Sequence, residues 1–391
     1  MKTTRRLVQA GFLILTVVGV FVVGGHAERW CPLGGVEGLY TYLTVGNLTC
    51  SLGVSNFYIL GGVLLLTLLV RRAFCGYACP IGTISEWVQL AARRLGLRAG
   101  RVPYRLDRAL ALLKYPVLGA ILYFTWKVGE LVFRGYDPCY ALISRHGEDI
   151  TLWAYVISGA ILLTSAVLVV PFCRWLCPLA AVFTPFSRPA LARVKRNGET
   201  CIDCGVCGRV CPMGIPVDRL RQVTAARCTS CLDCLTACPK RADGALVWGP
   251  PGTAGRSWPP GLVVAVMLLC IGGAVAATYV TPLPSFVWER GTPPTKPATL
   301  RLEVVGVRCR HSTELFVRQF DRDYELRVTG YLRVEAWPAP EVGAVRITYD
   351  AATATETQIK RAITEPLFDL LGGTLRPSPY RIVGYDPLAE H

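Results

Sequence analysis

Histidine is scarce in this chain, with four among 391 residues. Two of them, His26 and His146, lie near the ends of apolar segments. Two haems, each held by a pair of histidines, would need four imidazoles, and only His26 and His146 lie near the ends of apolar segments. We therefore expect no pair of b-type haems, and any redox chemistry must depend on other ligands.

Acidic residues are also few. The chain has 27 Asp and Glu against 42 Lys and Arg, which gives a formal net charge of +15. A basic surface is typical of nucleic-acid-binding proteins, but here the charges flank apolar segments, with eight arginines between residues 71 and 108. We interpret the charge as a topology signal and expect no nucleic-acid partner.

Apolar residues make up 52% of the sequence and raise its mean hydropathy to +0.39. This composition predicts an α-helical protein of the lipid bilayer. Five stretches are long enough, or nearly so, to cross it: 7–24, 54–70, 109–133, 152–172 and 261–280. The first is followed by no convincing small-residue cleavage site, so we interpret it as an uncleaved anchor.

The basic residues predict the orientation of these spans. The segments that begin at Arg71 and Arg188 are rich in Arg and Lys, whereas residues 26–53 contain one basic residue and residues 134–150 contain two. By the positive-inside rule, the amino terminus and the segment between the fourth and fifth spans are cytoplasmic. Everything after Val280 is then extracytoplasmic, in a multi-pass protein of the inner (cytoplasmic) membrane.

Two consecutive runs of cysteine share one spacing, C-x2-C-x2-C-x3-C-P. This is the pattern of bacterial two-cluster ferredoxins, in which the fourth cysteine of each run binds the other cluster. Zinc favours separated C-x2-C pairs, and disulfides have no reason to repeat this spacing. The sequence predicts two [4Fe-4S] clusters, one held by Cys201, Cys204, Cys207 and Cys238 and the other by Cys228, Cys231, Cys234 and Cys211.

A second repeat ends the second and fourth spans, F-C-G-Y-A-C-P at 74–80 and F-C-R-W-L-C-P at 172–178. If the helix continues through each motif, its two cysteines share one face. A two-fold arrangement then brings together Cys75, Cys79, Cys173 and Cys177. A lone pair would be packing residues, but four matched thiols favour, in this order, a further cluster or cluster-like site, a redox-active thiol set beside a quinol pocket, or structural zinc.

Five spans, two C-x3-C-P motifs and a two-cluster insert resemble the membrane polyferredoxin family, over about residues 1–280. The segments W-C-P-L-G-G-V-E at 30–37 and D-P-C-Y at 137–140 are also family-like. Members serve periplasmic nitrate reductase, nitrous oxide reductase and cupric-ion reduction during haem-copper oxidase assembly. The resemblance implies membrane-bound electron transfer, often linked to quinol oxidation. The chain lacks the long amino-terminal flavin domain of the nitrous-oxide-reductase type, which argues against a direct equivalent of that type.

The carboxy-terminal part is predicted to be a separate domain. Residues 281–298 are rich in Pro and Thr and predict a linker. The strands and helices predicted for residues 299–391 follow the order βαββαβ, which indicates an α+β ferredoxin-like fold without a cluster. The domain is similar to heavy-metal-associated domains, whose binding loop carries C-x2-C. Here the second position is Ser312, so either Cys309 with His311 binds metal or the domain is degenerate and serves docking.

Three other cysteines, Cys31, Cys50 and Cys139, fall in predicted outer loops, which face an oxidising compartment. Cys31 and Cys50 either form a disulfide or belong with Cys139 to a functional thiol or metal site. Cys270 lies inside the fifth span, where we expect a packing residue.

The predicted organisation is a four-helix membrane domain (1–197), a ferredoxin domain (198–248), a linker with the fifth transmembrane helix (249–280), a Pro-rich linker (281–298) and the terminal domain (299–391). We expect an electron-transfer subunit rather than a stand-alone enzyme. Its clusters exchange electrons with a cytoplasmic donor or acceptor protein, and the C-x3-C-P site couples them to the quinone pool or an extracytoplasmic redox partner. The alternatives are a metal-ion (cupric) reductase and a metal-handling assembly factor.

Overall fold

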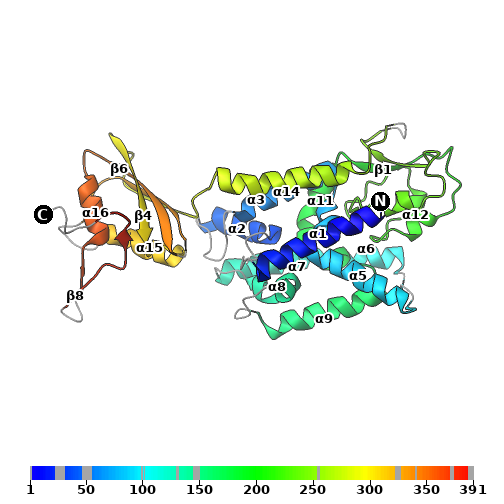
Figure 1. Ribbon diagram of the computed structural model, residues 1–391, viewed down its shortest axis with the longest axis horizontal. Helices are drawn as coiled ribbons and strands as arrows, with labels where there is room; N and C mark the ends of the chain where they lie inside the picture. Colours follow the sequence, from blue (N-terminus) through cyan, green and yellow to red (C-terminus); the bar gives the residue numbers. More distant parts are fainter. Residues whose placement is uncertain are drawn as a thin grey trace. The chain divides into compact units, whose positions relative to one another are not determined.

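The computed structural model divides into two compact units, each with its own hydrophobic core. The first consists of Met1–Glu37 and Ser55–Val280, and the second of Gly38–Val54 and Thr281–His391. Figure 1 shows the elements of both units. The structure describes residues 2–22, 31–45, 55–97, 100, 102–128, 132–143, 150–252, 256–321, 327–339, 341–369 and 374–385.

All five predicted apolar stretches contain helix. Within the described residues, three helical segments are long and apolar enough to cross a membrane, namely Thr3–Phe21, Tyr104–Val128 and Leu262–Val280. The predicted second and fourth spans form helices of 16 residues each, so they are shorter than a standard crossing. The helices concerned are α1 (Lys2–Phe21), α3 (Ser55–Val70), α6 (Tyr104–Leu110), α7 (Lys114–Val128), α9 (Leu152–Val167) and α14 (Leu262–Val280).

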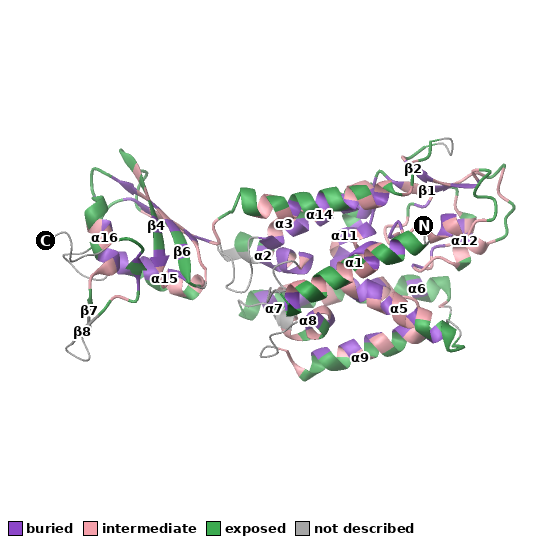
Figure 2. Ribbon diagram, in the orientation of Figure 1, coloured by how far each residue is buried: buried purple, intermediate pink, exposed green. Residues whose placement is uncertain are grey.

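Many residues of these helices are exposed, as Figure 2 shows along α1, α9 and α14, and apolar residues are among them. Leu15 is 68% exposed, Leu163 76% and Leu269 75%. Contiguous apolar surface of this kind is unfavourable in water and marks a membrane or an interface. Together with the length of the helices, it makes the first unit a membrane domain.

Helices α3 and α14 pack side by side through small residues. A Cβ atom at Gly62 would lie 2.7 Å from both the Cβ of Ala274 and the carbonyl oxygen of Cys270. Close approach through small residues is the usual way in which helices associate in lipid. Cys270 is buried in this contact, as expected of a packing residue.

The C-x3-C-P motifs do not continue the spans as single helices, so the condition under which the two cysteines of a motif would share one helical face is not met. Cys75 lies in a short helix, α4 (Ala73–Tyr77), and Cys79 is the N-cap of the next helix, α5 (Pro80–Arg94). The second copy has the same break between α10 (Pro171–Trp175) and α11 (Pro178–Ser187). The reason is the proline, which disfavours helical dihedrals at the preceding cysteine.

Two other helices of the chain begin beside cysteines of the predicted outer loops. Helix α2 (Pro32–Val45) directly follows Cys31. Helix α8 (Pro138–Ile143) contains Cys139 and is preceded by the 3-10 helix η2 (Val132–Tyr136).

The cysteine-rich part between α11 and α14 is closed by a small antiparallel sheet. Strand β1 (Arg193–Arg196) pairs with β2 (Leu246–Gly249), so the ends of this part are held together. Between them lie three short helices, α12 (Val206–Arg209), η3 (Val217–Arg219) and α13 (Asp233–Thr236). The side chain of Trp248 is 1% exposed and anchors the sheet in the core of the first unit.

The second unit contains a five-stranded antiparallel sheet in the order β3-β5-β6-β4-β9. Without β3 and the separate two-stranded sheet of β7 and β8, the elements follow the predicted order βαββαβ. The predicted linker 281–298 is partly wrong, since it includes the edge strand β3, which pairs with β5. The elements are β3 (Phe286–Arg290), β4 (Pro297–Val305), α15 (Arg310–Arg318), η4 (Gln319–Asp321), β5 (Leu332–Trp337), β6 (Val342–Asp350), α16 (Glu356–Thr364), β7 (Leu367–Asp369), β8 (Thr374–Arg376) and β9 (Arg381–Ile382).

Candidate metal centres

The two runs of cysteine line two separate pockets. One pocket encloses about 350 Å³ and is lined by Cys201, Cys204, Cys207 and Cys238 together with polar residues such as Asp203 and Lys240. Cys204 is exposed to solvent, and the guanidinium of Arg196 lies 3.5 Å from the sulfur of Cys201. We call this the outer pocket, because a soluble molecule can reach it.

The other pocket encloses about 370 Å³ and has apolar walls, formed by residues such as Val194, Ile215 and Leu232. Its cysteines are Cys211, Cys228, Cys231 and Cys234. Burial raises the pKa of the Cys211 thiol to about 11, because an apolar environment disfavours the thiolate. A bound metal would be needed to keep this ligand ionised. We call this the inner pocket.

Each pocket takes three cysteines from one run and the fourth from the other, which is the arrangement predicted from the spacing. Within the described part of the chain, no three His, Cys, Asp or Glu side chains converge as the ligands of one metal ion do. A [4Fe-4S] cluster takes one cysteine for each iron atom, and four cysteines line each pocket.

The inner pocket borders the first C-x3-C-P motif. The main-chain N–H of Arg72 donates to the carbonyl oxygen of Cys228 at 3.3 Å, and the hydroxyl of Tyr77 donates to the carbonyl oxygen of Ser230 at 3.2 Å. The fully buried side chain of Arg71 donates to three carbonyl oxygens beside the pocket. These belong to Ala192 (3.0 Å), Ala225 (3.0 Å) and Val223 (2.8 Å).

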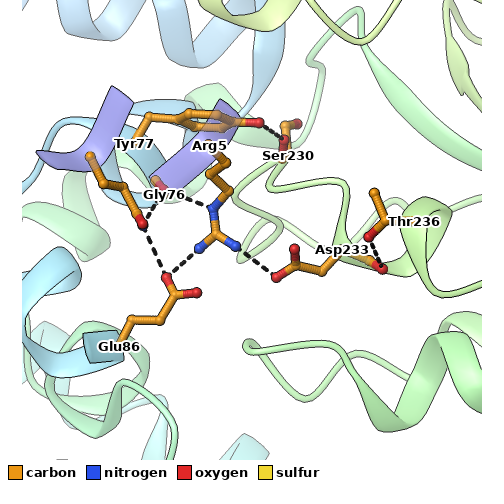
Figure 3. A network of polar contacts seen from close by, with 8 residues as sticks. Arg5, Gly76, Tyr77, Glu86, Ser230, Asp233 and Thr236 are labelled. Carbon is orange, nitrogen blue, oxygen red and sulfur yellow. Dashed lines mark hydrogen bonds and ion pairs between the residues drawn. The ribbon is translucent and has the colours of Figure 1, made fainter. Parts of the chain in front are cut away.

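Figure 3 shows a polar network that ties this border to the amino-terminal helix. Arg5, on α1, donates to the carbonyl oxygen of Gly76 at 3.2 Å and pairs with Asp233 at 2.6 Å. The same guanidinium pairs with Glu86 of α5. Arg5 is 7% exposed, so its charge depends on these carboxylates. One arginine therefore joins α1, both sides of the first C-x3-C-P motif and the ferredoxin part.

The second motif has a comparable anchor at Asp107, which is 1% exposed. This carboxylate pairs with Arg174, inside the second C-x3-C-P motif, and with Arg227, directly before Cys228. The indole N–H of Trp175 donates to it at 2.8 Å. Both motifs are thus fastened to the segment that lines the inner pocket.

The structure brings the four C-x3-C-P cysteines together. A thiolate at Cys173 would be repelled by thiolates at Cys75, Cys79 and Cys177. Cys75 and Cys177 also pack against a buried cluster that includes Phe183. We call the four cysteines of the two motifs, Cys75, Cys79, Cys173 and Cys177, the thiol group; the first motif borders the inner pocket.

Two buried cations face this thiol group. Arg72 is 2% exposed and Lys114 is 7% exposed, and both interact electrostatically with Cys177. Arg72 donates to the hydroxyl of Thr184 at 2.6 Å, but its Nε has no partner. Among the described residues, neither cation has a carboxylate within ion-pair distance. Arg72 was missed by the sequence analysis, although a doubled arginine at the end of an apolar helix is visible there.

Cys31 and Cys139 lie near the same thiol group, which the sequence analysis did not foresee. The thiol of Cys139 interacts electrostatically with those of Cys31, Cys79 and Cys177. The carbonyl oxygen of Cys31 accepts a hydrogen bond from the side-chain amide of Asn56 at 3.0 Å. Both cysteines are free thiols, and the predicted disulfide partner Cys50 lies outside the described residues.

In the second unit, the residues around Cys309 cap the amino-terminal end of helix α15. Ser312 accepts hydrogen bonds from the N–H groups of Arg308 and Cys309, at 2.8 and 2.9 Å. His311 is exposed. The position that carries the second cysteine in heavy-metal-associated domains therefore stabilises the start of α15, and the metal role of Cys309 and His311 stays a prediction.

Two protein families match the chain. A 4Fe-4S binding domain matches residues 52–98 and 150–197, so that each match contains one C-x3-C-P motif. A 4Fe-4S dicluster domain matches residues 193–239, which contain both ferredoxin runs. The matched segments are those that line the two pockets and the thiol group.

Three curated proteins are similar to this chain. YccM of Escherichia coli, whose name assigns it to electron transport, is 29% identical over 287 residues, or 69% of this chain and 79% of YccM. Protein NirI of Paracoccus denitrificans is 30% identical over 168 residues, or 42% of this chain and 24% of NirI. Ferredoxin-type protein NapH of Haemophilus influenzae is 26% identical over 190 residues, or 46% of this chain and 63% of NapH.

No solved structure matches the chain significantly. The apolar helices, the paired cysteine pockets and the matched 4Fe-4S domains agree with one another and with these relatives. These findings support a membrane polyferredoxin-like family for this chain.

Proposed function

We propose that this protein carries electrons between a soluble partner and the membrane through a series of iron–sulfur centres. The observation that carries the proposal is the border between the inner pocket and the first C-x3-C-P motif, where Arg72 is hydrogen-bonded to the backbone of Cys228. This contact supports the proposal, because it joins the segment that lines the inner pocket to the start of the first C-x3-C-P motif. The clusters would supply the redox chemistry, and the protein supplies their placement and surroundings.

The two pockets have different roles in this proposal. Cys201, Cys204, Cys207 and Cys238 would hold the cluster that exchanges electrons with a cytoplasmic protein, because Cys204 is exposed. Cys211, Cys228, Cys231 and Cys234 would hold the cluster that passes them on, since this pocket is apolar and adjoins the membrane helices. Solvent exposure is among the factors that set cluster potentials, so the two clusters should differ in potential.

The thiol group at the C-x3-C-P motifs would hold the next centre. Arg72 and Lys114 are buried cations without a carboxylate partner among the described residues. Burying unpaired charge is costly. Thiolates around a metal cluster carry negative charge, so a cluster at this position would compensate both cations. Neutral thiols would leave them uncompensated, which favours a cluster over packing cysteines.

The outward end of the path would be the quinone pool or an extracytoplasmic acceptor. We propose five crossings with the ferredoxin part in the cytoplasm. Helices α3 and α9, with 16 residues each, would cover about 24 Å at 1.5 Å per residue, less than the usual hydrocarbon thickness of about 30 Å. The adjoining helices α5 and α11 would complete these two crossings.

Anaerobic purification in detergent tests the proposal. We expect coloured protein with iron and acid-labile sulfide for more than two clusters, and electron paramagnetic resonance signals at different potentials. Cys204→Ser should change only the signal of the exposed cluster, which a soluble oxidant oxidises first. Cys231→Ser should change only the signal of the cluster in the inner pocket. Colourless, iron-free protein that contains zinc would contradict the proposal, as would clusters that neither a soluble protein donor nor quinol reduces.

A further inference from the structure

The two ferredoxin runs have the same unusual backbone at equivalent positions. The third and fifth residues of each run are left-handed: Asp203 (φ 50°) and Gly205 (φ 68°) in the first run, Ser230 (φ 48°) and Leu232 (φ 59°) in the second. Residues other than glycine are uncommon in this conformation. Left-handed residues in a loop turn backbone N–H groups toward one concave side, as in many iron–sulfur sites. Asp203 and Ser230 therefore hold the same place in the two pockets.

The hydroxyl of Ser230 is buried at the inner pocket without a partner. Ser230 lines this pocket and is 2% exposed. Its Oγ has no hydrogen-bond partner among the residues that the structure describes. Buried polar atoms are nearly always paired, so this hydroxyl indicates that the pocket receives a group with which it can bond.

The neighbouring polar groups are engaged with the first C-x3-C-P motif. Apart from the cysteines, Thr229 is the other polar residue that lines the inner pocket. Its side chain packs against Gly76, where an added Cβ would lie 3.2 Å from the Cβ of Thr229 and 3.4 Å from its hydroxyl oxygen. The hydroxyl of Tyr77 donates to the carbonyl oxygen of Ser230 at 3.2 Å (Figure 3), which fixes the peptide of Ser230. The side chain of Ser230 is therefore left to the pocket.

The outer pocket carries a different group at this position. Asp203 lines that pocket, but its side chain is 74% exposed and pairs with Arg196. An ionised carboxylate accepts hydrogen bonds and donates none, whereas a serine hydroxyl can donate one. The two pockets each contain four cysteines, so residues 203 and 230 distinguish them by their hydrogen-bonding capacity.

We propose that the hydroxyl of Ser230 donates a hydrogen bond to a sulfur atom of the cluster in the inner pocket and so raises its reduction potential. Hydrogen bonds strengthen as the acceptor becomes more negative, so the donor stabilises the reduced state more than the oxidised state. It offsets the apolar walls of the pocket, which disfavour the added charge.

This inference rests on the proposed function and adds a direction to it. A higher potential in the inner pocket favours transfer of one electron from the outer cluster, which is oxidised, to the inner cluster, which is reduced. Electrons from a soluble partner would then move toward the membrane helices. Ser230 acts as a positioning residue for this step, because the cysteines, and not its side chain, bind the iron.

The test is Ser230→Gly in the full-length protein, purified anaerobically in detergent. Glycine adopts a positive φ without strain, so the loop should keep its shape. We expect the reduction equilibrium of the inner cluster to shift about tenfold toward the oxidised form, or about 60 mV for one electron. The potential of the outer cluster should not change. Redox titration with electron paramagnetic resonance measures both, and the inner signal is the one that Cys231→Ser changes.

Two further variants separate the hydrogen bond from a structural effect. Ser230→Thr keeps a hydroxyl and should restore most of the potential, although a branched side chain destabilises the left-handed loop. Ser187→Ala removes another buried hydroxyl that has no partner among the described residues but lines neither pocket, and it should change neither potential. An unchanged inner potential in Ser230→Gly, with the cluster retained, would overturn the inference.

A spectroscopic measurement detects the proton itself. Electron–nuclear double resonance of the reduced inner cluster, in H2O and in D2O, should show an exchangeable proton that Ser230→Gly lacks and Ser230→Thr retains. Identical spectra for the unaltered protein and Ser230→Gly would contradict the inference while leaving the proposed function intact. Unaltered protein without a cluster in the inner pocket would refute both.

Discussion

The main-chain N–H of Arg72 donates a hydrogen bond to the carbonyl oxygen of Cys228 at 3.3 Å. Cys228 belongs to the second ferredoxin run, and Arg72 stands between α3 and the first C-x3-C-P motif. A backbone hydrogen bond therefore joins a cysteine of the inner pocket to the residue that follows the end of α3. Four predictions follow from this border, from the helices that carry it and from the second unit.

The charge of Arg72 should raise the potential of the centre at the thiol group. Its guanidinium interacts with Cys75, Cys173 and Cys177, and a nearby cation favours the more negative, reduced form of a cluster. In Arg72→Met we expect the midpoint potential of this centre to fall by on the order of 60 mV, a tenfold change for a one-electron couple. Redox titration followed by electron paramagnetic resonance measures it. Arg93→Met, at an exposed position of α5, is the control, and an equal shift in both variants would refute the prediction.

Arg5 should hold the ferredoxin part against the membrane helices. Arg5→Gln leaves Glu86 and Asp233 without their cation, and breaking a buried ion pair costs about 3–5 kcal/mol. Asp233→Asn should cost less, because Arg5 keeps Glu86. The thermal loss of cluster absorbance in detergent reports these changes, and the double variant should lose less than the sum of the two. Arg6→Gln changes the exposed neighbour on the same helix and should have no effect; strict additivity in the double variant would show that the pair does not interact.

Two neighbouring glycines of α3 should respond in opposite ways to alanine. A Cβ at Gly62 would lie 2.7 Å from Ala274 and Cys270 of α14, whereas a Cβ at Gly61 would meet nothing within 4 Å. Overpacking typically costs about 1–3 kcal/mol, so Gly62→Ala should lower the unfolding temperature in detergent. Gly61→Ala should leave it unchanged or raise it, since alanine favours helix by about 1 kcal/mol over glycine. Equal effects at the two positions would mean that α3 and α14 do not pack as described.

Asp350 should make the stability of the second unit depend on pH. Hydrogen bonds from the main-chain N–H groups of Ala352 and Thr295 hold the pKa of its carboxyl at about 2, below the value near 3.9 of an unfolded chain. The folded state therefore prefers the ionised form, so the stabilisation is present above about pH 4 and is lost as the pH falls to about 2.

The measurement compares Asp350→Asn with the unaltered segment 281–391, whose core lies within itself. We expect the variant to unfold at a lower temperature at pH 7, and the difference to shrink between pH 4 and pH 2. Glu303→Gln, at an exposed position of β4, is the control. A difference that is the same at every pH would show that the charge of Asp350 is not the cause.

The cysteine spacing alone predicted which thiols of the ferredoxin part belong together. In the two-cluster pattern the first three cysteines of a run bind one cluster and the fourth binds the other. The structure distributes the eight cysteines over two pockets in the predicted way. The βαββαβ order of the second unit was also predictable, because alternation with period two and helical periodicity are local properties of the chain.

Other features depended on contacts that no local pattern reports. The proline that ends each motif was visible in the sequence, but whether one helix would continue through Cys75 and Cys79 was not. The strand β3 was hidden in a stretch rich in Pro and Thr, because an edge strand needs only one neighbour, here β5, to form. The approach of Cys139 to Cys79 was not visible either, since a hydropathy plot assigns segments to loops without their depth.

What the sequence by itself determined is the chemistry: which thiols form sets, which helices are apolar and which end of each is basic. Spacing, hydropathy and charge act over a few residues, so they can be read without coordinates. Only the tertiary structure decided which sets adjoin, through Arg5 with Asp233 and Arg72 with Cys228. These contacts join residues far apart in the chain, and they form because buried charges and backbone groups must find partners wherever the fold brings them.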